Sequence, residues 1–136
     1  MYRGQPRHAH PLVVTAFRGV VIAVNTSSGR ETWRASLGGV GAVRLHVDEH
    51  RVIALGVSRM LVLDYTTGET IARVPVGGKT LLVDGDVAYL SDDGVVVAVD
   101  LVAGFVLWRN ELPGTGYGPA ALATPVASAQ GDVETP

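Results

Sequence analysis

From Leu12 onward, the chain is a series of short apolar runs separated by turns, and no segment shows a helical period. Some runs, such as 20–24 and 95–99, are apolar at every position, whereas others, such as 31–37 and 69–76, mix apolar and polar residues. A run that is apolar throughout predicts a strand covered on both faces. A mixed run predicts a strand that borders solvent. The pattern therefore predicts an all-β protein.

The runs recur because one stretch occurs three times, at residues 20–39, 59–78 and 95–114. The copies superpose without a gap on an acidic or amide residue, and a glycine follows four positions later and an arginine nine positions later. The copies are spaced by 39 and then 36 residues, the length of one supersecondary unit. The aligned positions are Asn25, Gly29, Trp33 and Arg34 in the first copy, Asp64, Gly68 and Arg73 in the second, and Asp100, Gly104, Trp108 and Arg109 in the third.

Each complete group predicts a four-stranded antiparallel meander, with strands A, B, C and D in chain order. We expect three such sheets, within residues 12–39, 40–78 and 79–114. The first lacks its own strand A, because residues 1–11 are polar and hold no strand pattern. Sheets whose strand C is apolar on both faces must lie between similar sheets, which is how blades stack in a β-propeller.

The turn between strands C and D can be interpreted residue by residue. An Asp or Asn at its start can accept hydrogen bonds from backbone amides two or three residues on. The glycine at its end permits a positive φ angle. The third copy has Ala103 where the others have Ser or Thr, so this turn loses one possible hydrogen bond. On strand D, Trp33 and Trp108 align with Ala72, and we expect the tryptophans to fill space between neighbouring sheets.

An apolar strand ending in Asp, then x-x-Thr-Gly, then a strand bearing Trp-Arg resembles the blade repeat of quinoprotein-like (PQQ-like) β-propellers. The matching segments are 23–34, 62–73 and 98–109, and the resemblance covers about residues 12–114. Families with this repeat include quinone-dependent dehydrogenases, outer-membrane assembly lipoproteins of the BamB type and sensor domains of bacterial kinases. The dehydrogenases carry an adjacent cysteine pair and a calcium-binding set beside the quinone, and this chain has no cysteine and no match to that set. The resemblance implies the scaffold without a cofactor.

Three blades are fewer than the four to eight that typically close a propeller. After Gly114, residues 117–124 align with strand A of the second copy, and we expect residues 115–125 to supply a strand A to the first sheet of another protomer. Two chains would then give a six-bladed ring, so a homodimer is favoured. The alternative is that residues 115–136 form a disordered tail, and disorder is expected for 126–136.

The composition of the chain limits the classes of partner that we expect. The chain has 136 residues, 47% of them hydrophobic, and a net charge of −2. Its ten arginines and one lysine are dispersed, which disfavours nucleic acid. No stretch is long and apolar enough to span a membrane. The N-terminus shows no signal peptide, so we expect a cytoplasmic protein, or a periplasmic one if a leader has been removed.

The candidate sites for chemistry are few. His8 and His10 could share one side of an extended segment and bind a metal, but a polar N-terminus explains them better. His46 and His50 are four residues apart, a spacing that suits two metal ligands on a helix. They lie on either side of a predicted hairpin turn instead, so this argument for a metal site fails. The acidic turns at 84–86 and 92–94 lie at opposite ends of one strand, so ordinary hairpin turns explain them better than calcium does. The aligned arginines are best explained as solvated charges on outer strands.

The sequence therefore predicts a non-catalytic propeller scaffold or interaction protein, with no cofactor and no metal. Its partner would be itself or another protein chain. Two alternatives stay open: a small-ligand binder or enzyme with a site on the axial channel between protomers, and a split propeller completed by a different chain.

Overall fold

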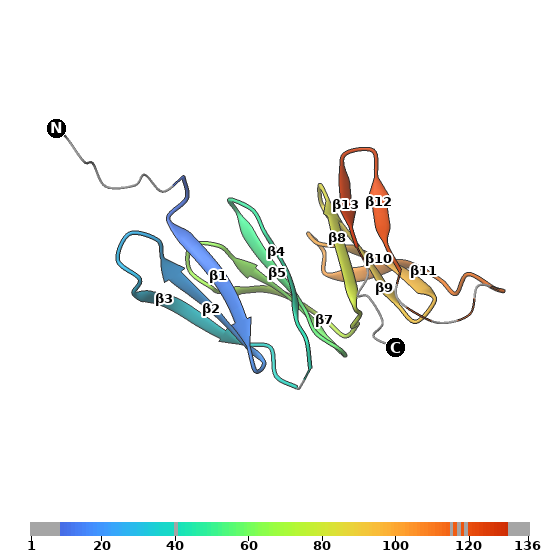
Figure 1. Ribbon diagram of the computed structural model, residues 1–136, viewed down its shortest axis with the longest axis horizontal. Coiled ribbons are helices and arrows are strands. Elements are labelled where there is room, and N and C mark those ends of the chain that lie inside the picture. Colours follow the sequence, from blue (N-terminus) through green and yellow to red (C-terminus); the bar gives the residue numbers. More distant parts are fainter. Residues whose placement is uncertain (1–8, 40, 115, 117, 119, 131–136) are drawn as a thin grey trace.

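The computed structural model describes residues 9–39, 41–114, 116, 118 and 120–130, and these form three antiparallel sheets followed by a short hairpin (Figure 1). The first sheet contains β1 (Leu12–Phe17), β2 (Val20–Asn25) and β3 (Glu31–Ser36). The second contains β4 (Arg44–Val47), β5 (Arg51–Leu55), β6 (Met60–Asp64) and β7 (Thr70–Val74). The third contains β8 (Thr80–Asp84), β9 (Val87–Asp92), β10 (Val95–Asp100) and β11 (Phe105–Asn110). The hairpin contains β12 (Leu122–Thr124) and β13 (Ala127–Ala129).

Each sheet is a meander in which every strand pairs with its neighbours in sequence. The all-β fold built of propeller blades is thus confirmed, and the first sheet starts at strand B as the sequence predicts. The three sheets also share an irregularity in strand pairing. In all three sheets the pairing of strands C and D shifts register at the same aligned position, after Ala23, Val62 and Ala98. We refer to the three sheets below as blades 1, 2 and 3.

The core lies between the blades, because the residues of the middle blade face its two neighbours alternately. Val52 and Ala54 belong to the core shared with blade 1, whereas Ile53 and Leu55 belong to the core shared with blade 3. All four side chains are fully buried. A strand buried on both faces needs apolar residues at successive positions, which is why strands B and C of this blade show no alternation.

The C-terminal region differs from the prediction. Strand β12 is shorter than the predicted strand at 117–124, and residues 117 and 119 lie outside the described residues. Strand β12 pairs with β13 of its own chain and lies against β8. Residues 127–129, within the segment for which disorder is expected, form strand β13, and Ala129 pairs with Leu122 in a regular antiparallel register. Residues 131–136 lie outside the described part of the chain.

Candidate functional site: uncovered blade faces and a rim pocket

The C–D turns of the three blades share one hydrogen-bond pattern. In blade 2, the Oδ1 atom of Asp64 accepts from the backbone amides of Thr66 and Thr67, both at 2.9 Å. The amide of Gly68 donates to the Asp64 carbonyl at 2.8 Å, and the φ angle of Gly68 is +75°. The same bonds form around Asn25 and Asp100. The turns are therefore rigid, and each places its glycine against the neighbouring blade.

A C–D turn covers a tryptophan at the boundary between blades 1 and 2. Trp33 on β3 is 7% exposed, and its Nε1 atom donates to the carbonyl of Tyr65 at 2.9 Å. A Cβ atom on Gly68 would lie 2.5 Å from the Trp33 ring, so the ring occupies the space that a side chain would take. Trp33 thus fills space between sheets, as the sequence predicts.

Trp108 has no neighbouring sheet to pack against among the described residues, so its expected place between two sheets stays a prediction. It holds the position of Trp33 in blade 3, yet it is 48% exposed. Its ring lies beside that of Tyr89 on its own blade, with centroids 6.2 Å apart and the planes tilted by 47°. No sheet in the described part of the chain packs on this face of blade 3. Four large apolar side chains of β11 are exposed: Phe105, Val106, Leu107 and Trp108. Only Trp108 has a buried counterpart, Trp33, since Ile71 at the position of Leu107 in blade 2 is also 51% exposed.

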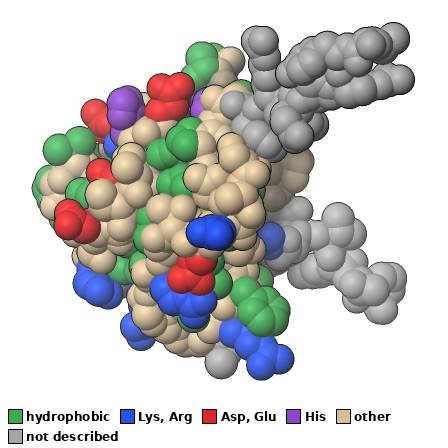
Figure 2. All heavy atoms as spheres, turned by 90° about the vertical axis from the view of Figure 1, so that its left-hand side faces the viewer, with side chains coloured by type: hydrophobic (Ala, Val, Ile, Leu, Met, Phe, Trp, Pro, Cys, Tyr) green, Lys and Arg blue, Asp and Glu red, His purple; other side chains and the backbone are tan. Residues whose placement is uncertain are grey.

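The opposite end of the stack is uncovered too. Val13 of blade 1 is 56% exposed, although the equivalent Val52 of blade 2 is fully buried. Phe17 is also exposed, and no atom lies within 4 Å of the position that a Cβ atom on Gly29 would occupy. Figure 2 views the molecule from this end and shows hydrophobic side chains reaching the surface among acidic, basic and histidine groups. Both terminal blades therefore present apolar side chains that no other sheet covers within the described residues.

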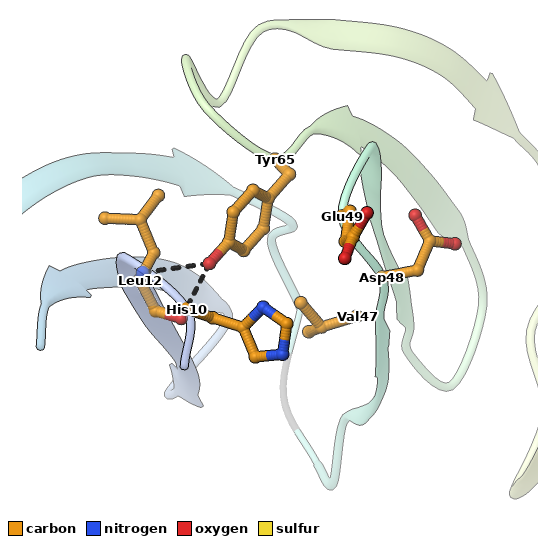
Figure 3. A pocket seen from close by; sticks show the side chains of 6 residues that line it. All are labelled: His10, Leu12, Val47, Asp48, Glu49 and Tyr65. Carbon is orange, nitrogen blue, oxygen red and sulfur yellow. Dashed lines mark hydrogen bonds between the residues drawn. The ribbon is translucent and has the colours of Figure 1, made fainter. Parts of the chain in front are cut away.

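One pocket of about 210 Å³ lies at the junction of blades 1 and 2 (Figure 3). The Tyr65 hydroxyl forms one of its walls and bridges the blades, because it donates to the Leu12 carbonyl and accepts from the Leu12 amide, both at 2.9 Å. The lining residues are His10, Leu12, Val47, Asp48, Glu49 and Tyr65. An imidazole and two carboxylates above an apolar floor suit a small ligand with a cationic and an apolar part.

Asp48, which lines this pocket, has a pKa below its ordinary value. Desolvation raises its pKa, but the combined opposing effects are larger and lower it. These effects are the backbone hydrogen bonds from His50 and Arg51 and the charges of Arg51 and His46. Arg51 also reaches blade 3, where Nη1 lies 3.0 Å from Oδ1 of Asp86 and Nη2 bonds the Gly85 carbonyl. The A–B turns of blades 2 and 3 are therefore joined along one rim.

The sequence did not predict this pocket, because its residues come from separate elements and share no motif. Of the two histidines considered as metal ligands, His10 lines the pocket and His8 is outside the described residues. His46, for which the ligand argument failed, lies 3.4 Å from Asp48. Within the described ranges, no group of three or more His, Asp or Glu side chains is placed to hold a metal. The acidic turns lie at the two ends of β9.

The aligned arginines are all exposed on the outer strands. Arg34 donates from Nε to Oε2 of Glu31 at 3.0 Å, and this hydrogen bond is the main cause that lowers the pKa of Glu31. Arg73 and Arg109 lie on β7 and β11. The three side chains do not converge on a common site.

Residues 12–133 match the protein family described as "Outer membrane protein assembly factor BamB". The chain belongs to this family. The match spans all three blades and the hairpin, so the PQQ-like repeat is shown along the described chain. No curated protein matches it. The described residues include no helix that is long and apolar enough to cross a membrane.

Solved structures share the fold. BamB from Moraxella catarrhalis is 18% identical with a TM-score of 0.66, and the match covers 88% of this chain and 39% of that one. The computationally designed Ika8 protein is 16% identical with a TM-score of 0.73, covering 92% of this chain and 41% of its own. A europium-containing methanol dehydrogenase is 16% identical with a TM-score of 0.57, covering 80% and 23%. This chain thus spans well under half the length of each, and identities this low show the fold alone.

Proposed function

We propose that this protein is a non-catalytic β-propeller scaffold that acts through contacts with protein chains and pairs with a second copy of itself. Trp108 on β11 carries the proposal, because it is 48% exposed whereas the equivalent Trp33, which a following blade covers, is 7% exposed. Three blades from each of two copies would give six, within the usual range of propellers. The family description, an assembly factor, agrees with a role in protein contacts.

The innermost strand of the shared ring is part of the same proposal. Strands β12 and β13 both lie against β8, the innermost strand of blade 3, where strand A of a following blade belongs. Strand β12 pairs with β13 over only three residue pairs. Strand β1 of a second copy, whose blade has no strand A among the described residues, would replace β13 beside β12 and complete a four-stranded sheet.

The rims of the ring supply rigid surfaces for protein partners. Since successive strands are antiparallel, the A–B and C–D turns lie at one end of every blade, and the B–C turns lie at the other. The first rim is acidic, with Asp48, Glu49, Asp64, Asp86 and Asp100 among its residues. Figure 2 shows acidic and histidine groups gathered toward one end of the molecule and basic groups toward the other. The first rim would therefore suit a protein partner with a basic surface.

Native mass spectrometry of the purified chain tests the proposal. We expect a species of two copies that dissociates on dilution. A single-copy species at every concentration would contradict self-assembly, and a stable complex with a different protein would favour a propeller shared between two kinds of chain.

The rim pocket favours one alternative, a small-ligand binder. Its carboxylates and His10 surround an apolar floor beside strand A, close to the axis of the ring. Isothermal titration with small aromatic amines tests this role. Binding that is lost in Glu49→Gln and retained in Glu69→Gln would support it.

A further inference from the structure

The blades recognise each other through one repeated contact. At the first boundary, the ring of Trp33 lies against Gly68, and its Nε1 donates to the carbonyl of Tyr65. At the second boundary, the equivalent Ala72 lies against Gly104, where a Cβ atom would be 3.0 Å from the Ala72 Cβ. In both cases strand D of one blade packs under the C–D turn of the next.

Among the described residues, each end of the stack carries one part of this contact without the other. Blade 3 has a strand D tryptophan with no turn above it, and blade 1 has a C–D turn with no strand D beneath it. Trp108 offers an exposed indole, and its Nε1 has no hydrogen-bond partner among the described residues. At the other end, Gly29 belongs to a C–D turn of the same geometry, with a φ angle of +73° and open space above it. Thr26 holds the position of Tyr65, so its carbonyl is placed to accept a hydrogen bond.

We propose that Trp108 of one copy docks under the C–D turn of blade 1 in a second copy, with its indole against Gly29 and its Nε1 bonded to the Thr26 carbonyl. The inference rests on the proposed self-assembly and names the surfaces that form it. The contact is heterologous, because two different patches meet, and each copy carries one of each. Two copies can therefore close a ring through two equivalent contacts.

The shape of the contact, as well as its repetition along the chain, indicates which surface Trp108 binds. A tryptophan at the equivalent boundary leaves no room for a side chain at Gly68. The partner of Trp108 must therefore present a glycine at that point of its turn. Blade 1 does so with Gly29, and its exposed Val13 and Phe17 would be covered at the same time.

One variant blocks the C–D turn of blade 1 and another blocks Trp108. Pairing of the full chain is measured by native mass spectrometry. Gly29→Asn adds a side chain while tolerating the positive φ angle, and Trp108→Glu places a charge in the contact. We expect each to weaken pairing by about thirtyfold or more, as for a central tryptophan of an interface. Gly85→Asn and Ile71→Glu are the matched controls, because Gly85 also has a positive φ angle with open space above it and Ile71 is 51% exposed on the outer strand of the middle blade. Both should pair like the wild type.

Mixing the two blocked variants tests the head-to-tail geometry. Trp108 of the Gly29→Asn chain still meets an intact Gly29 on the Trp108→Glu chain, so in an equal mixture we expect the mixed pair to exceed the two kinds of self-pair combined. Random association would make half of all pairs mixed, so a mixed share of one half or less would overturn the geometry. If both variants pair as well as the wild type, self-assembly stands but uses other surfaces. If the wild type itself stays single, the proposed self-assembly fails together with this inference.

A readout without substitutions uses the tryptophan fluorescence of the wild type. Trp33 is already buried, so a blue shift of the emission as concentration rises would report burial of Trp108. Pairing seen by mass without that shift would overturn the proposed contact.

Discussion

The indole Nε1 of Trp33 donates to the backbone carbonyl of Tyr65 at 2.9 Å, and this bond joins blade 1 to blade 2. The two residues are far apart in sequence, and the bond is buried. A buried hydrogen bond between neighbouring sheets fixes their register as well as their distance. The boundary between blades is therefore specified by a polar contact in addition to apolar packing.

Replacing Trp33 by alanine should cost about 3–5 kcal/mol of unfolding free energy, because a large buried side chain is removed and the Tyr65 carbonyl loses its donor. The measurement is urea denaturation followed by circular dichroism. Trp108→Ala is the matched control, and it should cost about 1 kcal/mol or less at concentrations where the chain is single, because that side chain is half exposed. Equal losses in the two variants would show that Trp33 does not anchor the boundary.

Gly→Ala substitutions at Gly68 and Gly29 allow the cost of backbone strain to be distinguished from the cost of crowding a neighbouring side chain. Gly68 and Gly29 have nearly the same φ angle, +75° and +73°, so Gly→Ala at either should cost about 1–2 kcal/mol from strain. At Gly68 the new Cβ would also meet the Trp33 ring at 2.5 Å, and we expect about 1–3 kcal/mol more. Chemical denaturation of both variants, again under conditions that keep the chain single, gives the difference. A difference near zero would mean that the ring moves aside at little cost.

The sequence was sufficient for features whose causes are local. The Asx-type turns at Asn25 and Asp64 follow from side-chain hydrogen bonds within three residues, and they appear as predicted. The exposure of Trp108 could not be predicted in this way, because the residue type is the same as at Trp33 and only the absence of a covering blade in the described residues differs. Strand β13 was missed because Ala127–Ala129 is built of small residues without β-branched side chains.

Asp64 should make stability depend on pH. The backbone amide of Thr67 is the main cause that lowers its pKa, helped by the Thr67 hydroxyl and the Thr66 amide. The carboxylate therefore stabilises the fold above its unfolded-state pKa, and this contribution is lost as pH falls through the lowered, folded-state pKa. In Asp64→Asn, the loss of unfolding free energy between pH 7 and pH 3 should be smaller than in the wild type.

The reverse substitution provides the control for that experiment. Asn25 accepts the same two amide bonds in blade 1, so Asn25→Asp should increase the loss of unfolding free energy at low pH. Denaturant titrations of both variants at the two pH values measure the effect. If Asp64→Asn and Asn25→Asp change the pH dependence in the same direction, hydrogen bonding to the charged carboxylate is not its cause.

The guanidinium of Arg51 joins blades 2 and 3, and its planar geometry is what allows this. One nitrogen bonds the Asp86 carboxylate and another the Gly85 carbonyl, while Nε lies 3.4 Å from Asp48, and the side chain is only 16% exposed. Lysine keeps the charge but cannot reach several acceptors in a fork. Arg51→Lys should therefore cost about 1–3 kcal/mol of unfolding free energy, measured by urea denaturation.

The control is Arg73→Lys, at an exposed arginine without an ion pair among the described residues. This substitution should change the unfolding free energy by less than about 0.5 kcal/mol. If the two substitutions cost the same, charge alone accounts for Arg51 and the fork between the blades contributes nothing to stability.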